Sequence, residues 1–127
     1  MMNKIQFYSP AGVEHVNKKW GEEVIIHNGY EYCGKILRFK PNGMFSMHFH
    51  AEKSESWYVN KGEFVMDYID TETAERKTIV LKQGMVVDIP KYQPHKLFTL
   101  DGGEIFEVST QHFDDDSYRV EKGDSQK

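Results

Sequence analysis

The chain has 127 residues, the length of one ordinary domain, so we expect a single domain over residues 1–127. Its 16 Lys and Arg and 20 Asp and Glu give a net charge of −4. That balance argues against unspecific binding to nucleic acid or to an anionic membrane, because both need a basic face. The longest apolar run is three residues and the first fifteen positions contain no hydrophobic leader, which predicts a cytoplasmic protein without a membrane span.

The composition favours strands over helices. Val (10) and Ile (8) outnumber Leu (4) and Ala (3), and β-branched side chains pack well on a pleated sheet. Apolar residues alternate with polar ones along the chain, and Gly, Pro, Asn or Asp interrupt the runs. The pattern predicts an all-β sandwich or barrel. Its nine strands are expected at residues 23–27, 30–39, 44–49, 55–60, 63–69, 76–81, 85–89, 94–100 and 104–110.

The last segment, residues 111–127, is acidic. It carries five acidic residues against three basic ones, which is half of the net charge of the chain. A charged stretch after the last strand predicts a solvated terminus. The only cysteine, Cys33, allows no disulfide within the chain and is expected to be a small buried side chain.

The residues that carry chemistry are three histidines and a carboxylate. His48 and His50 stand two apart on one predicted strand, so their side chains share a face. Glu55 opens the next strand and can turn its carboxylate toward that face, and His95 opens a later strand. Together they would form a mixed nitrogen and oxygen site for one divalent metal ion, with Fe, Mn, Zn, Ni and Co all suitable. The other three histidines lie near termini or in loops.

The spacing of these residues resembles the two signature motifs of the cupin superfamily. The first motif covers residues 43–62 and holds the His-x-His pair followed by Glu55; the second covers residues 84–99 and holds His95. Tyr92 stands where the family commonly has Gly, and Thr99 where it commonly has Asn. The resemblance implies a double-stranded β-helix, a small jelly-roll barrel, with His48, His50, Glu55 and His95 holding the metal inside it. A lone strand histidine is more often structural, but four residues at this spacing favour a metal site.

A narrower likeness covers more of the chain. Residues 19–23, 34–37, 53–59, 104–110 and 114–116 look like parts of the cupin domain of type II mannose-6-phosphate isomerases. That family usually has Gln at the place of His48 and Arg at the places of Lys53 and Lys96, and its tail ends in a Tyr-Gly-Arg segment that is missing here. The likeness implies aldose–ketose isomerisation. Phosphate recognition should be weaker, because Lys lacks the bidentate fork of Arg.

Two residues are candidates for catalysis, each with a plainer interpretation. Lys53 lies between two expected ligands, but Lys53 and Lys96 could both be solvated surface lysines. Glu107 alternates with Phe106 and Val108, so it is either exposed or, if its face lines the barrel, an acid or base. Alternation also places Trp57, Val59 and Leu97 inside the barrel, where a core role is favoured over a platform for sugar stacking.

The leading functional hypothesis is a metal-dependent isomerase of a sugar or sugar phosphate, with a small carbohydrate as the ligand. A cupin dioxygenase is an alternative, because three His and one Glu suit iron equally well. A non-catalytic module that senses a sugar or another small ligand is a third. A homodimer is expected, since pairing would cover the exposed edge of a sheet.

Overall fold

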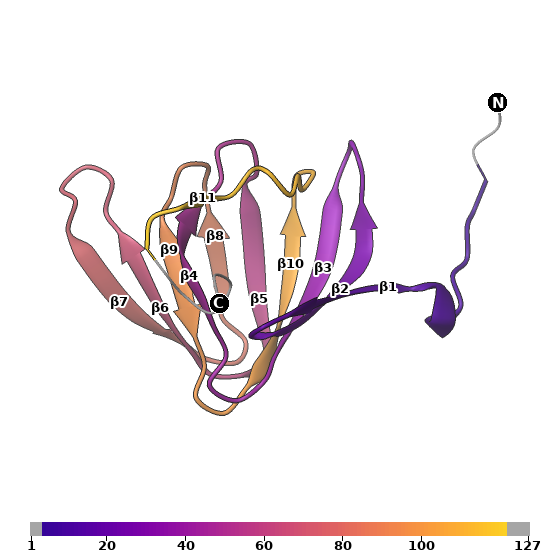
Figure 1. Ribbon diagram of the computed structural model, residues 1–127, viewed down its shortest axis with the longest axis horizontal. Coiled ribbons are helices and arrows are strands. Elements are labelled where there is room, and N and C mark those ends of the chain that lie inside the picture. The colour runs from indigo at the N-terminus through magenta and orange to yellow at the C-terminus, as the bar shows by residue number, and fades with distance from the viewer. Residues whose placement is uncertain (1–3, 122–127) are drawn as a thin grey trace.

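The computed structural model describes residues 4–121, which form two antiparallel sheets packed face to face (Figure 1). The six-stranded sheet has the order β1-β2-β3-β10-β5-β8 and the five-stranded sheet the order β11-β4-β9-β6-β7. A short 3-10 turn, η1 (Pro10–Gly12), precedes the first strand. The strands are β1 (Glu14–Lys18), β2 (Gly21–Asn28), β3 (Cys33–Phe39), β4 (Met44–Phe49), β5 (Glu55–Gly62), β6 (Phe64–Ile69), β7 (Arg76–Leu81), β8 (Val86–Ile89), β9 (His95–Phe98), β10 (Gly103–Ser109) and β11 (Tyr118–Arg119).

The all-β prediction is confirmed, and the arrangement is a jelly-roll barrel. All nine predicted strands are present, and β4 and β7 have the predicted bounds. β3 begins at Cys33, not at residue 30, because the backbone N–H of Gly29 donates to the carbonyl of Tyr32 and closes a turn. Alternation missed β1 and β11. β1 contains one apolar residue, Val16, and β11 has only two residues, so neither shows a readable period.

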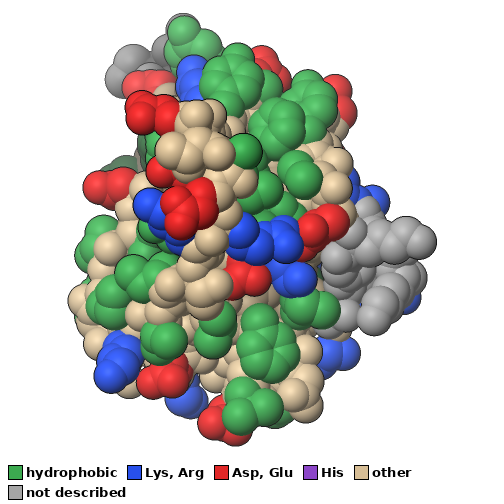
Figure 2. All heavy atoms as spheres, turned by 90° about the vertical axis from the view of Figure 1, so that its left-hand side faces the viewer, with side chains coloured by type: hydrophobic (Ala, Val, Ile, Leu, Met, Phe, Trp, Pro, Cys, Tyr) green, Lys and Arg blue, Asp and Glu red, His purple; other side chains and the backbone are tan. Residues whose placement is uncertain are grey.

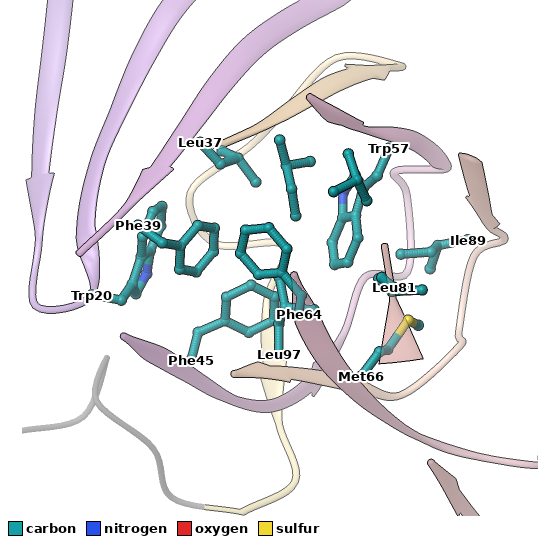
Figure 3. Packing of buried hydrophobic residues seen from close by; sticks show 12 residues of the cluster. Trp20, Leu37, Phe39, Phe45, Trp57, Phe64, Met66, Leu81, Ile89 and Leu97 are labelled. Carbon is teal, nitrogen blue, oxygen red and sulfur yellow. The ribbon is translucent and has the colours of Figure 1, made fainter. Parts of the chain in front are cut away.

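The apolar core fills the space between the sheets (Figure 3). Trp20 stacks on Phe39 with ring centroids 4.3 Å apart, and Phe39 meets Phe64 edge to face at 5.1 Å. Trp57, Val59 and Leu97 are at most 2% exposed, as their alternation predicted. Aromatic side chains of this size contribute most of the apolar burial in a small domain.

The inward positions become polar toward one end of the barrel. β5 passes from buried Val59 through Trp57 to Glu55, and β9 passes from Leu97 back to His95. In β10 the buried Glu107 pairs in register with Trp57. Because side chains alternate strictly along a strand, these polar groups are held inside by the same register that buries the apolar ones.

Most described residues of the segment after β10 are exposed, as its charge predicts, but the segment is also anchored to the barrel. Tyr118 and Arg119 form β11, which pairs with Phe49 and His48 of β4. Asp116 is 2% exposed, whereas Asp114 and Asp115 are exposed. Short-range charge predicted solvation, but the chain returns across the barrel and buries one of three consecutive carboxylates. Residues 122–127 of the predicted tail lie outside the described residues.

The outer face on the β6 and β7 side mixes charges with apolar side chains (Figure 2). Arg76 and Lys96 both reach Glu121, at 2.8 and 3.7 Å, and Lys77 reaches Asp70 at 3.6 Å. Exposed pairs of this kind contribute little to stability. Within residues 4–121, no helix has the length and apolar character needed to cross a membrane.

Candidate metal centre

Three imidazoles meet at the polar end of the barrel. His48 lies on β4 and pairs in register with His95 at the start of β9, and His50 follows directly after β4. Each ring offers one nitrogen, and these three nitrogens all lie within 4.8 Å of one another. The structure therefore brings together the three histidines that the sequence singled out, and the cluster supports a divalent-metal site.

The other ring nitrogens are held by backbone carbonyls. Nδ1 of His48 lies 2.7 Å from the carbonyl oxygen of Ser46, and Nδ1 of His95 lies 2.8 Å from that of Gln93. Nδ1 of His50 lies 2.6 Å from the carbonyl oxygen of Asp116. Since a carbonyl only accepts, each imidazole carries its proton on Nδ1 and leaves the lone pair of Nε2 free. This second contact fixes the tautomer and the ring orientation, as it does in histidines that bind metals.

Burial keeps these rings neutral. It lowers the pKa of His48 to about 3, with the neighbouring His95 adding to the effect. The pKa values of His50 and His95 fall to about 4, again mainly through burial. A metal binds the neutral form of imidazole, so no proton has to leave these rings at neutral pH.

Glu55 lies beside the imidazole cluster, although the group of ligand atoms within 4.8 Å of one another contains only the three histidines. Its Oε2 atom lies 3.5 Å from Nε2 of His50 and 3.9 Å from Nε2 of His95, while its Oε1 atom accepts a hydrogen bond from the indole N–H of Trp57 at 2.8 Å. Within residues 4–121, Glu55 Oε2 and His95 Nε2 are buried without a hydrogen-bond partner. Unpaired buried polar atoms are rare and costly. These two atoms lie 3.9 Å apart, a pairing that fits a nearby cation, and the three imidazole nitrogens suit Fe, Mn, Zn, Ni and Co alike.

A buried ion pair lies beside this cluster. Nζ of Lys53 is 3.1 Å from Oε2 of Glu107 and 3.8 Å from Oε1 of Glu55, and both Lys53 and Glu107 are at most 4% exposed. Burial alone opposes both charges, but their attraction outweighs it: the pKa of Lys53 is raised, and that of Glu107 is held well below its usual range by Lys53 and Lys35. The interpretation of Lys53 as a solvated surface lysine is therefore wrong. Glu107 faces the barrel interior, which confirms one of the two orientations that its alternation allows.

Lys96 lies apart from the centre. Its side chain is a quarter exposed and its Nζ atom is 3.7 Å from Glu121. It neighbours His95 in sequence but points to the opposite face, as alternation along a strand requires. Of the two lysines at the expected phosphate positions, Lys53 is paired inside the barrel and Lys96 is paired outside it.

The imidazole cluster and the ion pair share one partly open cavity of about 400 Å³. Its apolar wall includes Phe45 and Trp57, and Lys18, Lys19 and Arg119 add positive charge. His112, which no sequence pattern indicates, also lines the cavity, and its Nδ1 atom lies 3.3 Å from Nζ of Lys53. His112 lies in an irregular segment after β10, where no periodicity could have predicted its direction.

The profile of the Cupin domain family matches residues 35–110, more than half of the chain. The protein belongs to the cupin family. No curated protein matches the chain.

Solved structures repeat the fold. Oxalate decarboxylase from Bacillus subtilis, in a structure at pH 4.6, matches with a TM-score of 0.77 and 16% identity over 94% of this chain and 33% of that one. A second structure of that decarboxylase, which concerns its Mn(II) centres, matches with a TM-score of 0.76 and 16% identity over 94% of this chain and 34% of that one. CapF, a capsular polysaccharide assembling protein from Staphylococcus aureus, matches with a TM-score of 0.72 and 20% identity over 86% of this chain and 32% of that one. The chain spans about a third of the length of these proteins, and at such identities the likeness concerns the fold alone.

Proposed function

We propose that His48, His50, His95 and Glu55 hold one divalent metal ion in an enzyme that interconverts an aldose and a ketose, as a sugar or sugar phosphate. One observation carries the proposal: the buried Lys53–Glu107 pair borders the same cavity as the imidazole cluster. A group that can move a proton thus stands beside a site that can polarise a carbonyl. The resemblance to type II mannose-6-phosphate isomerases supports the same class of reaction.

When bound, the metal ion supplies Lewis-acid polarisation of the carbonyl and the adjacent hydroxyl. Glu107, held as a carboxylate by Lys53, takes the proton from the hydroxyl-bearing carbon next to the carbonyl. It then returns this proton to the former carbonyl carbon. A second proton passes from the hydroxyl oxygen to the former carbonyl oxygen. Atoms and electrons balance within the substrate, so the reaction needs no oxidant or reductant.

The two lysines that stand where the isomerases have Arg argue against the phosphate site of that family. Lys53 is paired with Glu107 and Lys96 with Glu121, so neither offers a free cation to a ligand in the cavity. Mannose-6-phosphate should be turned over slowly or not at all. An unphosphorylated sugar or a different acid is the better substrate class.

The test begins with elemental analysis of the purified protein and continues with NMR-detected turnover of aldoses, ketoses and their phosphates. At least one sugar should be isomerised at an enzymatic rate, ~1–1000 per second. Glu107→Gln should keep its metal and lower the rate ~100-fold or more. Glu104→Gln, on the same strand but paired with Arg38 outside the cavity, should retain the wild-type rate. A Glu107→Gln variant with the full rate would refute the role of Glu107.

The same preparation separates the other two classes. Oxygen consumption without isomerisation would identify a cupin dioxygenase, which uses the same ligand set with iron. Sugar binding without turnover would identify a non-catalytic module. Either result overturns the isomerase, and a protein that takes up no divalent metal overturns the metal centre as well.

A further inference from the structure

Asp116 ties the segment after β10 to the loop that joins His50 to Glu55. Its carboxylate accepts hydrogen bonds from three consecutive backbone N–H groups: Ala51 at 2.8 Å, Glu52 at 3.1 and 3.2 Å, and Lys53 at 3.0 Å. Its own carbonyl lies 2.6 Å from Nδ1 of His50. One residue thus contacts both the backbone of this loop and a histidine of the imidazole cluster.

The geometry of this contact is specific. Successive N–H groups that converge on one carboxylate form an anion-binding concavity, and hydrogen bonds to a charged acceptor are stronger than neutral ones. The segment is also fixed on its far side, because β11 pairs with β4 and the N–H of Val120 donates to the carbonyl of Met47. Asp116 therefore belongs to a segment that is anchored to the strand of His48 as well as to the loop after His50.

We propose that Asp116 is a positioning residue of the metal centre, an inference that rests on the proposed function. Its carboxylate fixes the backbone of residues 51–53 and so places Lys53 between Glu55 and Glu107. Its carbonyl fixes the tautomer and orientation of His50. Weakening this contact leaves every expected ligand in the chain but lets the loop and the imidazole move. Mutation of a group that holds a metal ligand in this way typically lowers the metal affinity ~10–100-fold.

The test compares Asp116→Asn with Asp115→Asn, a neighbouring exposed position with the same change of charge. Asn keeps the shape of Asp but turns an NH₂ group toward a backbone N–H, which opposes one donor with another. Transfer of Zn²⁺ to a chelator should be ~10–100-fold faster for Asp116→Asn, and the absorption spectrum of its Co²⁺ form should shift. Asp115→Asn should match the wild type in both measurements. Asp116→Ser keeps one shorter acceptor and should give an intermediate rate, which provides a second variant if Asp116→Asn folds poorly.

A purely structural role is tested with Leu81→Val, a substitution in the apolar core on β7. It should lower the unfolding temperature without changing the Zn²⁺ transfer rate or the Co²⁺ spectrum. Equal effects of Leu81→Val and Asp116→Asn on both readouts would overturn the positioning role, as would an unchanged rate in Asp116→Asn. Hydrogen exchange of the amides of residues 51–53 in the metal-free protein tests the role of Asp116 separately from the proposed metal-dependent function. Faster exchange in Asp116→Asn supports the contact even if no variant binds metal, and unchanged exchange refutes it.

Discussion

The two sheets offer different chemistry to the cavity they share. β4 and β9 of the five-stranded sheet place uncharged imidazoles there, His48 and His95, each with Nδ1 on a backbone carbonyl. β5 and β10 of the six-stranded sheet place ionisable groups there, Glu55 and Glu107, with Lys53 just before β5. Buried charges are stable only when they are paired. The imidazole wall therefore offers a cation neutral ligands. On the other wall Lys53 keeps Glu107 a carboxylate, whereas burial and the neighbouring Glu107 raise the pKa of Glu55 to about 8.

This contrast predicts different effects of substitutions on the imidazole wall, His48 and His95, and on the charged wall, Glu55 and Glu107. Removing an imidazole should empty the metal site and leave the ion pair intact. Removing one member of the ion pair should leave a buried charge without its partner and destabilise the fold, while the imidazole cluster stays in place.

The largest effect is expected from the imidazole wall. His50→Ala removes one of the three clustered nitrogens, and metal content after dialysis should fall from about one ion per chain to nearly none. The stabilisation that bound metal gives the native state, ~2.7 kcal/mol at a hundredfold excess over Kd, should be lost with it. Elemental analysis and thermal unfolding measure both effects.

The matched control is His15→Ala. His15 lies on β1 and its partner is Glu22 on β2, away from the cluster, so this variant should keep its metal. His112 is not a suitable control, because it lines the cavity and contacts Lys53. Equal metal content in the His50 and His15 variants would refute the site.

The charged wall should give the next largest effect. Lys53→Met leaves Glu107 buried beside Glu55 without its nearest cation, which should lower the free energy of unfolding by about 3–5 kcal/mol. Lys53→Met combined with Glu107→Gln should recover part of that loss, because two neutral groups replace one unpaired charge. Urea denaturation, carried out after a chelator has removed the metal, measures these free energies of unfolding.

An exposed pair provides the comparison for the buried one. Lys77→Met removes the partner of Asp70, 3.6 Å away on the outer face, and should cost less than about 1 kcal/mol. If the Lys53 and Lys77 variants lose the same free energy, burial does not strengthen the inner pair and the contrast between the walls fails.

The sequence predicted the parts of the site that periodicity controls. His48 and His95 lie on strands where alternation fixes the side-chain direction, and the same alternation placed Trp57 and Leu97 in the core. For Glu107, alternation leaves two faces open, because only the packing of the sheets determines which face of β10 lines the barrel.

Residues outside the strands could not be placed in this way. Lys53 precedes β5 in an irregular loop. Because alternation predicts side-chain direction only within a strand, the sequence could not show that Lys53 is buried. His112 and Asp116 reach the site only because the chain turns back after β10 and pairs β11 with β4. That return joins residues 59 and 66 positions apart, which a local pattern cannot predict.

The apolar end of the barrel should respond independently of both walls. The hydroxyl of Thr99 donates to the carbonyls of Glu63, at 2.9 Å, and Gly102, at 3.2 Å. Thr99→Val removes this buried hydroxyl and leaves two partly exposed carbonyls without that donor, which should cost about 0.5–1.5 kcal/mol. Metal content and the Zn²⁺ transfer rate should not change. A loss of metal in this variant would show that the two ends of the barrel are coupled.

The smallest effect on the fold should come from the outer face of the six-stranded sheet. Val86, Tyr58 and Phe106 stand side by side on β8, β5 and β10, and all three are exposed. This apolar row reaches the β8 edge of the sheet, where a second copy could cover both the row and the open strand. We therefore expect a homodimer, measured by light scattering at micromolar concentration.

Phe106→Lys should give monomers. The free energy of unfolding of each chain should change by no more than about 0.5 kcal/mol, and one metal ion per chain should be retained. A wild-type monomer would refute this pairing. Metal loss in Phe106→Lys, whose neighbour Glu107 faces the cavity, would show that the two faces of β10 do not act separately.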